Sequence, residues 1–242
     1  MTVPDIAMAN RIIFENDACM VINKIPGESS ELGETVQTGG KPKFPLPVHR
    51  LDVPVSGCIL FAKTQEAAAF LSAAFARRDK RVTKTYWAIV EMPSQGTAFQ
   101  GEASLVHWLY EDRKLNKAFA EPWKEGKPPL KARLPPPRKA VLRYRVTGQG
   151  ERYLFMEINL ITGRHHQIRA QLAALGIHVK GDLKYGARRS EKNGGIRLHA
   201  YSLTFPDPLN PGSVIEANAL PPELDPLWTA CKDSVLQGKN TG

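Results

Sequence analysis

The sequence predicts an α+β fold, with a mixed, mainly antiparallel sheet flanked by a few helices. Two observations support this prediction. Short runs rich in aliphatic and aromatic residues outnumber the helical segments, and most of these runs follow one another without a helix between them. A doubly wound parallel sheet would need a crossover, usually a helix, between its strands. With 242 residues, of which 42% are hydrophobic, the chain can bury the core of one domain spanning residues 1–242.

Seven segments have the composition of β-strands. They cover residues 11–14, 19–25, 57–63, 82–92, 140–146, 153–160 and 198–205.

Three segments are predicted to be helices. Residues 65–78 are rich in alanine, have apolar residues at helical spacing and end in two arginines. In residues 162–176, TGRHHQIRAQLAALG, Thr162 can cap the start and Gly176 can supply a left-handed end. The third helix lies in PPELDPLWTACKDSVL, near the end of the chain.

The positive charge is concentrated in two stretches. Lys and Arg outnumber Asp and Glu by 33 to 24, a net charge of +9. Residues 111–145 hold eleven basic and four acidic side chains, and residues 164–197 hold eight and two. Such clustering indicates a polyanionic partner, most often a nucleic acid, although a basic surface without a partner is the alternative.

Residues 107–139 are rich in Pro, Lys and Arg, which opposes regular structure and favours an extended, basic loop. Long irregular loops inside compact domains are usually functional or disordered. We therefore predict that this loop contacts RNA phosphates, through Lys127, Lys131, Arg133, Arg138 and Lys139.

No apolar run approaches the roughly 20 residues that a membrane helix needs. The N-terminus lacks the basic start and long apolar middle of a signal peptide, so a cytoplasmic location is expected. Cys19, Cys58 and Cys231 are widely spaced and form no CxxC pair, which favours buried thiols over disulfides or a zinc site.

Several separated motifs together resemble the RluA-type pseudouridine synthases. They are HRLDxxxSG around Asp52, KxYxAxV around Tyr86, TGRxHQIRxxLxxxG around Arg169, then GDxxYG and LHAxxLxFxxP. The resemblance covers roughly residues 11–216, and its order and spacing make it far more specific than any single motif. One departure is Val55, where the family commonly has Thr, and no change of chemistry is expected from it.

The resemblance implies an RNA isomerase that works without a cofactor or a metal. A chosen uridine of a structured RNA, ribosomal or transfer, would become pseudouridine: its uracil is detached from the ribose, turned, and rejoined through carbon in a cleft across the sheet. Because the first predicted strand lies close to the start of the sequence, we expect no small N-terminal RNA-binding domain of the kind that many members carry. We expect a monomer that selects RNA with its catalytic domain.

The resemblance also implies roles for individual residues. Asp52 would be the nucleophile, attacking either the sugar or the base, and Arg169 would keep its carboxylate ionised. Tyr86 would stack on the target base. Leu198 would oppose that base, Arg50 would help to take its place in the RNA stack, and Arg164 would bind RNA.

The residue chemistry is compatible with these roles. Carboxylates can form covalent intermediates, and a neighbouring guanidinium favours the charged form at neutral pH. A uridine inside structured RNA must be extruded, which requires a ring to stack on it and a side chain to fill its place.

Other interpretations stay open at this point. Taken singly, Asp52 could cap a turn, Tyr86 could be strand packing and Arg169 could lie on the surface. The whole chain could be a catalytically inactive RNA-binding protein of the same fold. A metal hydrolase using His49, His165, His166 and Asp52 is disfavoured, because adjacent helical residues point about 100° apart.

Overall fold

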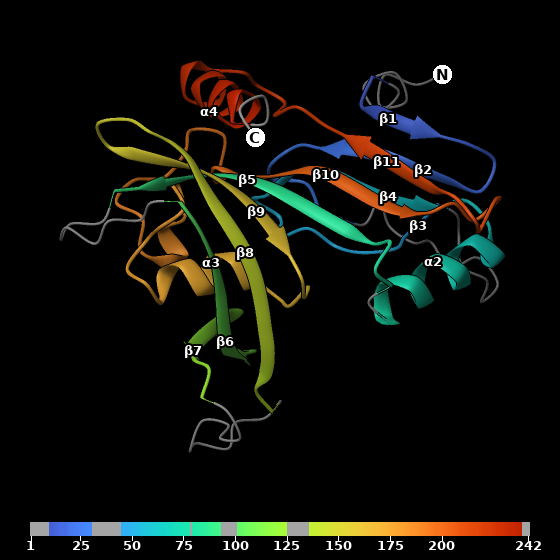
Figure 1. The fold of residues 1–242 in the computed structure, drawn as a ribbon, viewed down its shortest axis with the longest axis horizontal. Coiled ribbons are helices and arrows are strands. Elements are labelled where there is room, and N and C mark those ends of the chain that lie inside the picture. Colours follow the sequence, from blue (N-terminus) through green and yellow to red (C-terminus); the bar gives the residue numbers. More distant parts are fainter. Residues whose placement is uncertain (1–9, 31–44, 78, 93–100, 125–135, 239–242) are drawn as a thin grey trace. The chain divides into compact units, whose positions relative to one another are not determined.

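The structure is a computed structural model that describes residues 10–30, 45–77, 79–92, 101–124 and 136–238. The chain divides into two compact units. Unit 1 comprises Met1–Lys84 and His199–Glu223, and unit 2 comprises Thr85–Leu198 and Leu224–Gly242. Both units are built on strands that pair mainly antiparallel, with helices beside them, so the predicted α+β class is confirmed (Figure 1).

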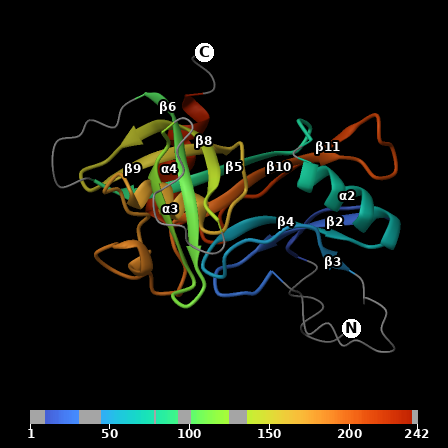
Figure 2. The ribbon, with the colours of Figure 1, turned by 90° about the horizontal axis from the view of Figure 1, so that it is seen from below.

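Unit 1 contains a mixed sheet in the order β1–β2–β4–β10–β11, to which the short β3 adds at β4. The β4–β10 pair is parallel and the others are antiparallel. Helix α2 lies against β4 (Figure 2) and buries Ala67 and Leu71 in a shared apolar core with Val21, Leu60 and Phe205. The bounds are β1 Ile12–Glu15, β2 Cys19–Lys24, β3 Leu46–Pro47, β4 Ser56–Ala62, α2 Gln65–Arg77, β10 Leu198–Pro206 and β11 Val214–Asn218.

Unit 2 contains an antiparallel sheet in the order β5–β9–β8–β6–β7. Helix α3 packs on β6 and β7, and helix α4 packs on β8 and β9. The bounds are β5 Thr83–Glu91, β6 Glu102–Asp112, β7 Lys117–Pro122, β8 Arg138–Gln149, β9 Tyr153–Leu160, α3 Gln167–Ala173, the 3₁₀ turn η1 Leu183–Tyr185 and α4 Pro226–Gln237. None of the helices that the structure describes is both long enough and apolar enough to cross a bilayer.

The seven predicted strands and three predicted helices are all present, but the second helix begins later than expected. The residue preceding α3 is His166, which has a left-handed backbone (φ 51°) and makes no side-chain cap. Thr162 instead accepts a hydrogen bond from the Val141 N–H at 2.8 Å and donates one to Gln167 Oε1 at 2.8 Å. The TGRHH segment is therefore a loop, which the Thr162 hydroxyl ties both to β8 and to the side chain of the first residue of α3.

The prediction of one extended loop over residues 107–139 is wrong for its first half. Residues 102–122 form the β6–β7 hairpin, and β8 begins at Arg138. Alternate residues of β6 (Leu105, His107 and Leu109) are buried, which is the period of a strand with one covered face. The Asp112 carboxylate accepts the N–H groups of two turn residues, Lys114 and Leu115, and closes the hairpin. Residues 125–135 lie outside the described part of the chain.

Candidate active site

In unit 1, the turn that bears Asp52 is held by buried groups on both of its sides. The Ser30 hydroxyl donates to the Leu51 carbonyl at 2.8 Å and accepts the Leu51 N–H at 2.9 Å. On the other side, the Val53 carbonyl accepts the Gly27 N–H at 2.9 Å, and the Asp52 carbonyl accepts the Val55 N–H at 2.9 Å. Leu51 is buried, whereas Asp52 is partly exposed and Arg50 is exposed. The backbone of a candidate nucleophile is thus fixed while its side chain stays accessible.

Lys24 is a second, unpredicted component of this turn. Lys24 is 2% exposed, and its ammonium group donates to the carbonyls of Ile25, Glu28 and Val53 at 2.9–3.0 Å. Burial lowers the pKa of Lys24 to about 8, and the negative charges of Glu28 and Asp52 oppose that shift. A lysine at the end of the largely apolar strand CMVINK was the available sequence signal.

Two of the motifs meet in the β4–β10 pair. The Ser56 hydroxyl hydrogen-bonds to His199 Nδ1 at 2.8 Å, and His199 Nε2 lies 2.8 Å from the Ala219 carbonyl oxygen. Burial lowers the pKa of His199 to about 4, so the ring is neutral at pH 7. Gly57 has φ 115°, and a Cβ there would overlap the Ala200 backbone. The SG of the first motif and the LHA of the last motif therefore pack against each other in the β4–β10 pair.

In unit 2, Arg169 is held by Asp182. The two side chains, 4% and 1% exposed, form a two-pronged ion pair, with Nε–Oδ2 at 2.6 Å and Nη2–Oδ1 at 2.8 Å. The guanidinium also lies over the Tyr185 ring, 4.8 Å from its centroid. Asp182 and Tyr185 are the D and the Y of the GDLKYG motif. Because the guanidinium group is planar, these two contacts fix the orientation of the Arg169 side chain.

Tyr185 and His166 extend this cluster to the sheet edge. The Tyr185 hydroxyl accepts the Ala118 N–H at 2.8 Å, donates to the Ala118 carbonyl at 3.1 Å, and lies 2.9 Å from His166 Nδ1. Burial, followed by the charge of Arg169, lowers the pKa of His166 to about 2, so His166 is neutral. The buried Arg169–Asp182 pair therefore lies beside the neutral His166, and the Lys117 ammonium lies 4.9 Å from the Tyr185 ring centroid.

Tyr86 lies on β5 opposite Ile158 of β9 and is 7% exposed. Leu198, the first residue of β10, is buried as well. Tyr86, Arg169 and Leu198 belong to unit 2, and Asp52 and Arg50 to unit 1. The expected hydrogen bond between Asp52 and Arg169 stays a prediction.

Two predicted RNA-binding residues come together in unit 2. Arg138 and Arg164 line a cavity of about 160 Å³ with Arg113, Tyr110 and Glu111. Arg164 Nε also lies 3.5 Å from the Lys139 carbonyl oxygen. Lys127, Lys131 and Arg133 lie outside the described residues.

The histidines considered as metal ligands have other surroundings. His49 is partly buried, stacks on Phe75 with ring centroids 5.2 Å apart, and accepts the Leu60 N–H. His165 and His166 stack on each other at 3.8 Å instead of pointing apart, because His166 precedes the helix. Within the described ranges, no three His, Cys, Asp or Glu side chains form a group that could hold a metal ion.

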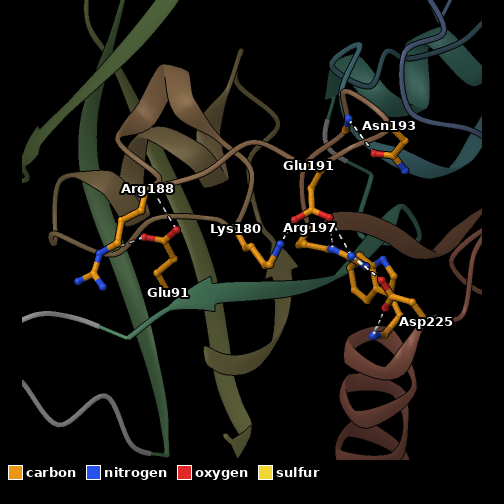
Figure 3. Close-up of polar contacts among 9 residues, drawn as sticks. Glu91, Lys180, Arg188, Glu191, Asn193, Arg197 and Asp225 are labelled. Carbon is orange, nitrogen blue, oxygen red and sulfur yellow. Dashed lines mark hydrogen bonds and ion pairs between the residues drawn. The ribbon is translucent and has the colours of Figure 1, made fainter. Parts of the chain in front are cut away.

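A chain of ion pairs fixes the segment after GDLKYG (Figure 3). Glu191 pairs with Lys180 and Arg197, and Arg197 also pairs with Asp225, the residue that caps α4. Nearby, the Glu91 carboxylate of β5 accepts the Arg188 N–H at 3.0 Å. These contacts hold residues 180–197 against β5 and α4, and so stabilise the segment that leads to Leu198.

The family of the chain follows from comparison with known proteins. Residues 20–174 match the family model described as RNA pseudouridylate synthase. The chain belongs to the RNA pseudouridylate synthase family. This is a family of RNA isomerases, so the predicted enzyme class and the predicted resemblance are both confirmed.

Individual relatives agree with this assignment. Dual-specificity RNA pseudouridine synthase RluA of Vibrio vulnificus is 30% identical over 210 residues, which are 81% of this chain and 78% of that protein. Ribosomal large subunit pseudouridine synthase C of Vibrio parahaemolyticus is 27% identical over 84% of this chain and 63% of that protein, so the chain spans less than two thirds of that relative. The solved structure of human RNA pseudouridylate synthase domain containing 4 has a TM-score of 0.69 at 21% identity. It covers 97% of this chain and 96% of that one, and it shows the shared fold.

Proposed function

We propose that the chain converts a specific uridine of a structured RNA to pseudouridine, with Asp52 as the nucleophile. The observation that supports this most directly is the Asp52 turn, whose backbone is held by Ser30, Gly27 and Lys24 while the carboxylate side chain stays partly exposed. If Asp52 only capped a turn, that turn would not need the buried ammonium group of Lys24 bound to it.

Each residue has a stated task in this proposal. Asp52 forms a covalent bond to the target nucleotide while the glycosidic bond to nitrogen breaks. The uracil turns and its carbon bonds to the ribose. The bond to Asp52 breaks, that carbon loses its proton and the former glycosidic nitrogen gains one, so the product is an isomer. Tyr86 stacks on the base, Leu198 opposes it and Arg169 stabilises the Asp52 carboxylate. Arg50 fills the space that the extruded uridine leaves in the RNA.

Ribosomal or transfer RNA is the proposed substrate. Three relatives are named ribosomal large subunit pseudouridine synthase C, and one is named a dual-specificity RNA pseudouridine synthase. Mapping pseudouridine in ribosomal and transfer RNA from cells with and without this gene tests the substrate directly. We expect at least one site to be absent only in the deletion strain, whereas identical maps would contradict this choice of RNA.

Asp52→Asn tests the nucleophile. The amide has nearly the same shape as the carboxylate but is a poor nucleophile, so we expect turnover to disappear while RNA affinity and the unfolding temperature stay close to the wild type. Asp233→Asn, which changes a surface carboxylate on α4, is the matched control and should retain full turnover. Appreciable turnover by pure Asp52→Asn protein would exclude this nucleophile. A wild-type protein that binds RNA but converts no uridine would instead favour the inactive RNA-binding protein.

A further inference from the structure

The β6–β7–β8 part of unit 2 has two different faces. On the inner face, Leu109 of β6, Ala118 of β7 and Ala140 of β8 pack with Ala170 of helix α3. The alternate residues point the other way: Trp108 and Tyr110 on β6, and Lys139 on β8 directly opposite Trp108. Strand alternation therefore presents a second face that bears no part of the α3 core.

Aromatic side chains gather on this second face. Trp108 stacks on Trp123 with ring centroids 4.2 Å apart, and Tyr110 stacks on Phe119 at 5.5 Å. All four rings are partly exposed. The α4 segment makes its hydrogen bonds with β8 at Arg145 and Thr147, several residues along the strand from Lys139, which lies opposite Trp108. Single apolar side chains scattered over a surface are normal, whereas partly exposed aromatic pairs grouped on one face indicate a binding surface.

Cations lie directly on these rings. The Lys139 ammonium is 4.2 Å from the Trp123 ring centroid. The Lys117 ammonium, at the edge strand, is 5.5 Å from the Phe119 centroid and 4.9 Å from that of Tyr185. Cross-strand packing explains the ring pairs by themselves. It does not call for ammonium groups beside them, in a stretch of the chain with eleven basic and four acidic residues. Rings and ammonium groups together match the two components of single-stranded RNA, its bases and its phosphates.

We propose that this aromatic face, defined by Trp108, Tyr110, Phe119, Trp123, Lys117 and Lys139, binds unpaired bases of the RNA substrate by stacking. Lys117 and Lys139 contact the phosphates that flank the stacked bases. The inference rests on the proposed function, because it takes the substrate to be RNA, and it adds that the bound part includes unpaired nucleotides outside the target uridine. Every base has a π-face, so the face recognises single-stranded character and not a sequence.

Trp123→Leu and Trp123→Phe test the proposal, with binding to a labelled oligouridine of about 16 nucleotides measured across a salt series. Loss of one stacked base is expected to weaken the affinity of Trp123→Leu roughly 5- to 150-fold. Stacking releases no counterions, so the slope of log affinity against log salt should stay the same. Trp123→Phe keeps an aromatic ring and should recover most of the affinity.

Trp228→Phe is the matched control, because Trp228 is a buried residue of α4 and lies outside the aromatic face. The affinity of this variant for oligouridine should equal that of the wild type. Circular dichroism and the unfolding temperature show that each variant is folded. A fully folded Trp123→Leu protein with wild-type affinity for oligouridine overturns the proposal. So does an equal loss of affinity for a duplex RNA of the same length.

The assay separates this inference from the proposed function. Wild-type protein that forms pseudouridine, together with a Trp123→Leu variant of unchanged affinity, would reject the aromatic face alone. Wild-type protein that binds oligouridine through Trp123 but forms no pseudouridine in ribosomal or transfer RNA would reject the enzyme activity and leave the aromatic face supported.

Discussion

At the scale of single residues, the position of Arg169 depends on Asp182. Asp182→Asn should lower the free energy of unfolding by about 3–5 kcal/mol, because it leaves the buried guanidinium of Arg169 without its counter-charge. It should also lower turnover, since one of the two hydrogen bonds that orient the Arg169 side chain is lost. Chemical denaturation and single-turnover kinetics measure the two effects.

Two comparisons make this prediction specific. Glu15→Gln, in a partly exposed pair with Lys63, should change stability by about 1 kcal/mol or less. The double variant Arg169→Met with Asp182→Leu should recover part of the stability but not the turnover, because both buried charges are removed together. Equal stability of Asp182→Asn and the wild type would mean that the ion pair does not hold Arg169.

At the scale of elements, the β4–β10 pair needs a glycine at position 57. Gly57→Ala would place a methyl group in the Ala200 backbone and force a side chain into φ 115°, so we expect strongly destabilised protein, by at least about 3 kcal/mol. Gly176→Ala is the control: its φ of 72° is also left-handed, but no atom lies within 4 Å of the added methyl. Its destabilisation should stay near about 1 kcal/mol. Comparable destabilisation of the two variants in thermal unfolding would show that backbone strain, and not close packing, governs Gly57.

At the scale of the whole molecule, the charge of +9 should make RNA binding depend on salt. Replacing Lys127, Lys131, Arg133, Arg138 and Lys139 by Gln should weaken binding and flatten the log–log salt dependence by roughly 0.7–0.9 for each phosphate group that the variant no longer neutralises. Lys80→Gln, in an exposed turn of unit 1, should leave the slope unchanged. An unchanged slope in the five-residue variant would assign the phosphate binding to residues 164–197 instead.

The local patterns of the sequence determined the seven predicted strands, the three helices and the family. Strand and helix periods, turn residues and the motifs around Asp52, Tyr86 and Arg169 are properties of short segments, and the sequence alone shows them. The β6–β7 hairpin was missed because Pro and Lys in residues 124–139 masked the alternation of His107, Leu109 and their neighbours.

The tertiary structure decided which distant residues meet. Asp182 with Arg169, Ser56 with His199, and Lys24 with Val53 are pairs whose partners are 13, 143 and 29 residues apart. The order of strands and the path of the loops bring such partners together, and the energy of each pair depends on a burial that no short segment encodes. For that physical reason the sequence by itself determined the family and predicted the residues of the site, and only the tertiary structure decided how Asp52 and Arg169 are each held in place.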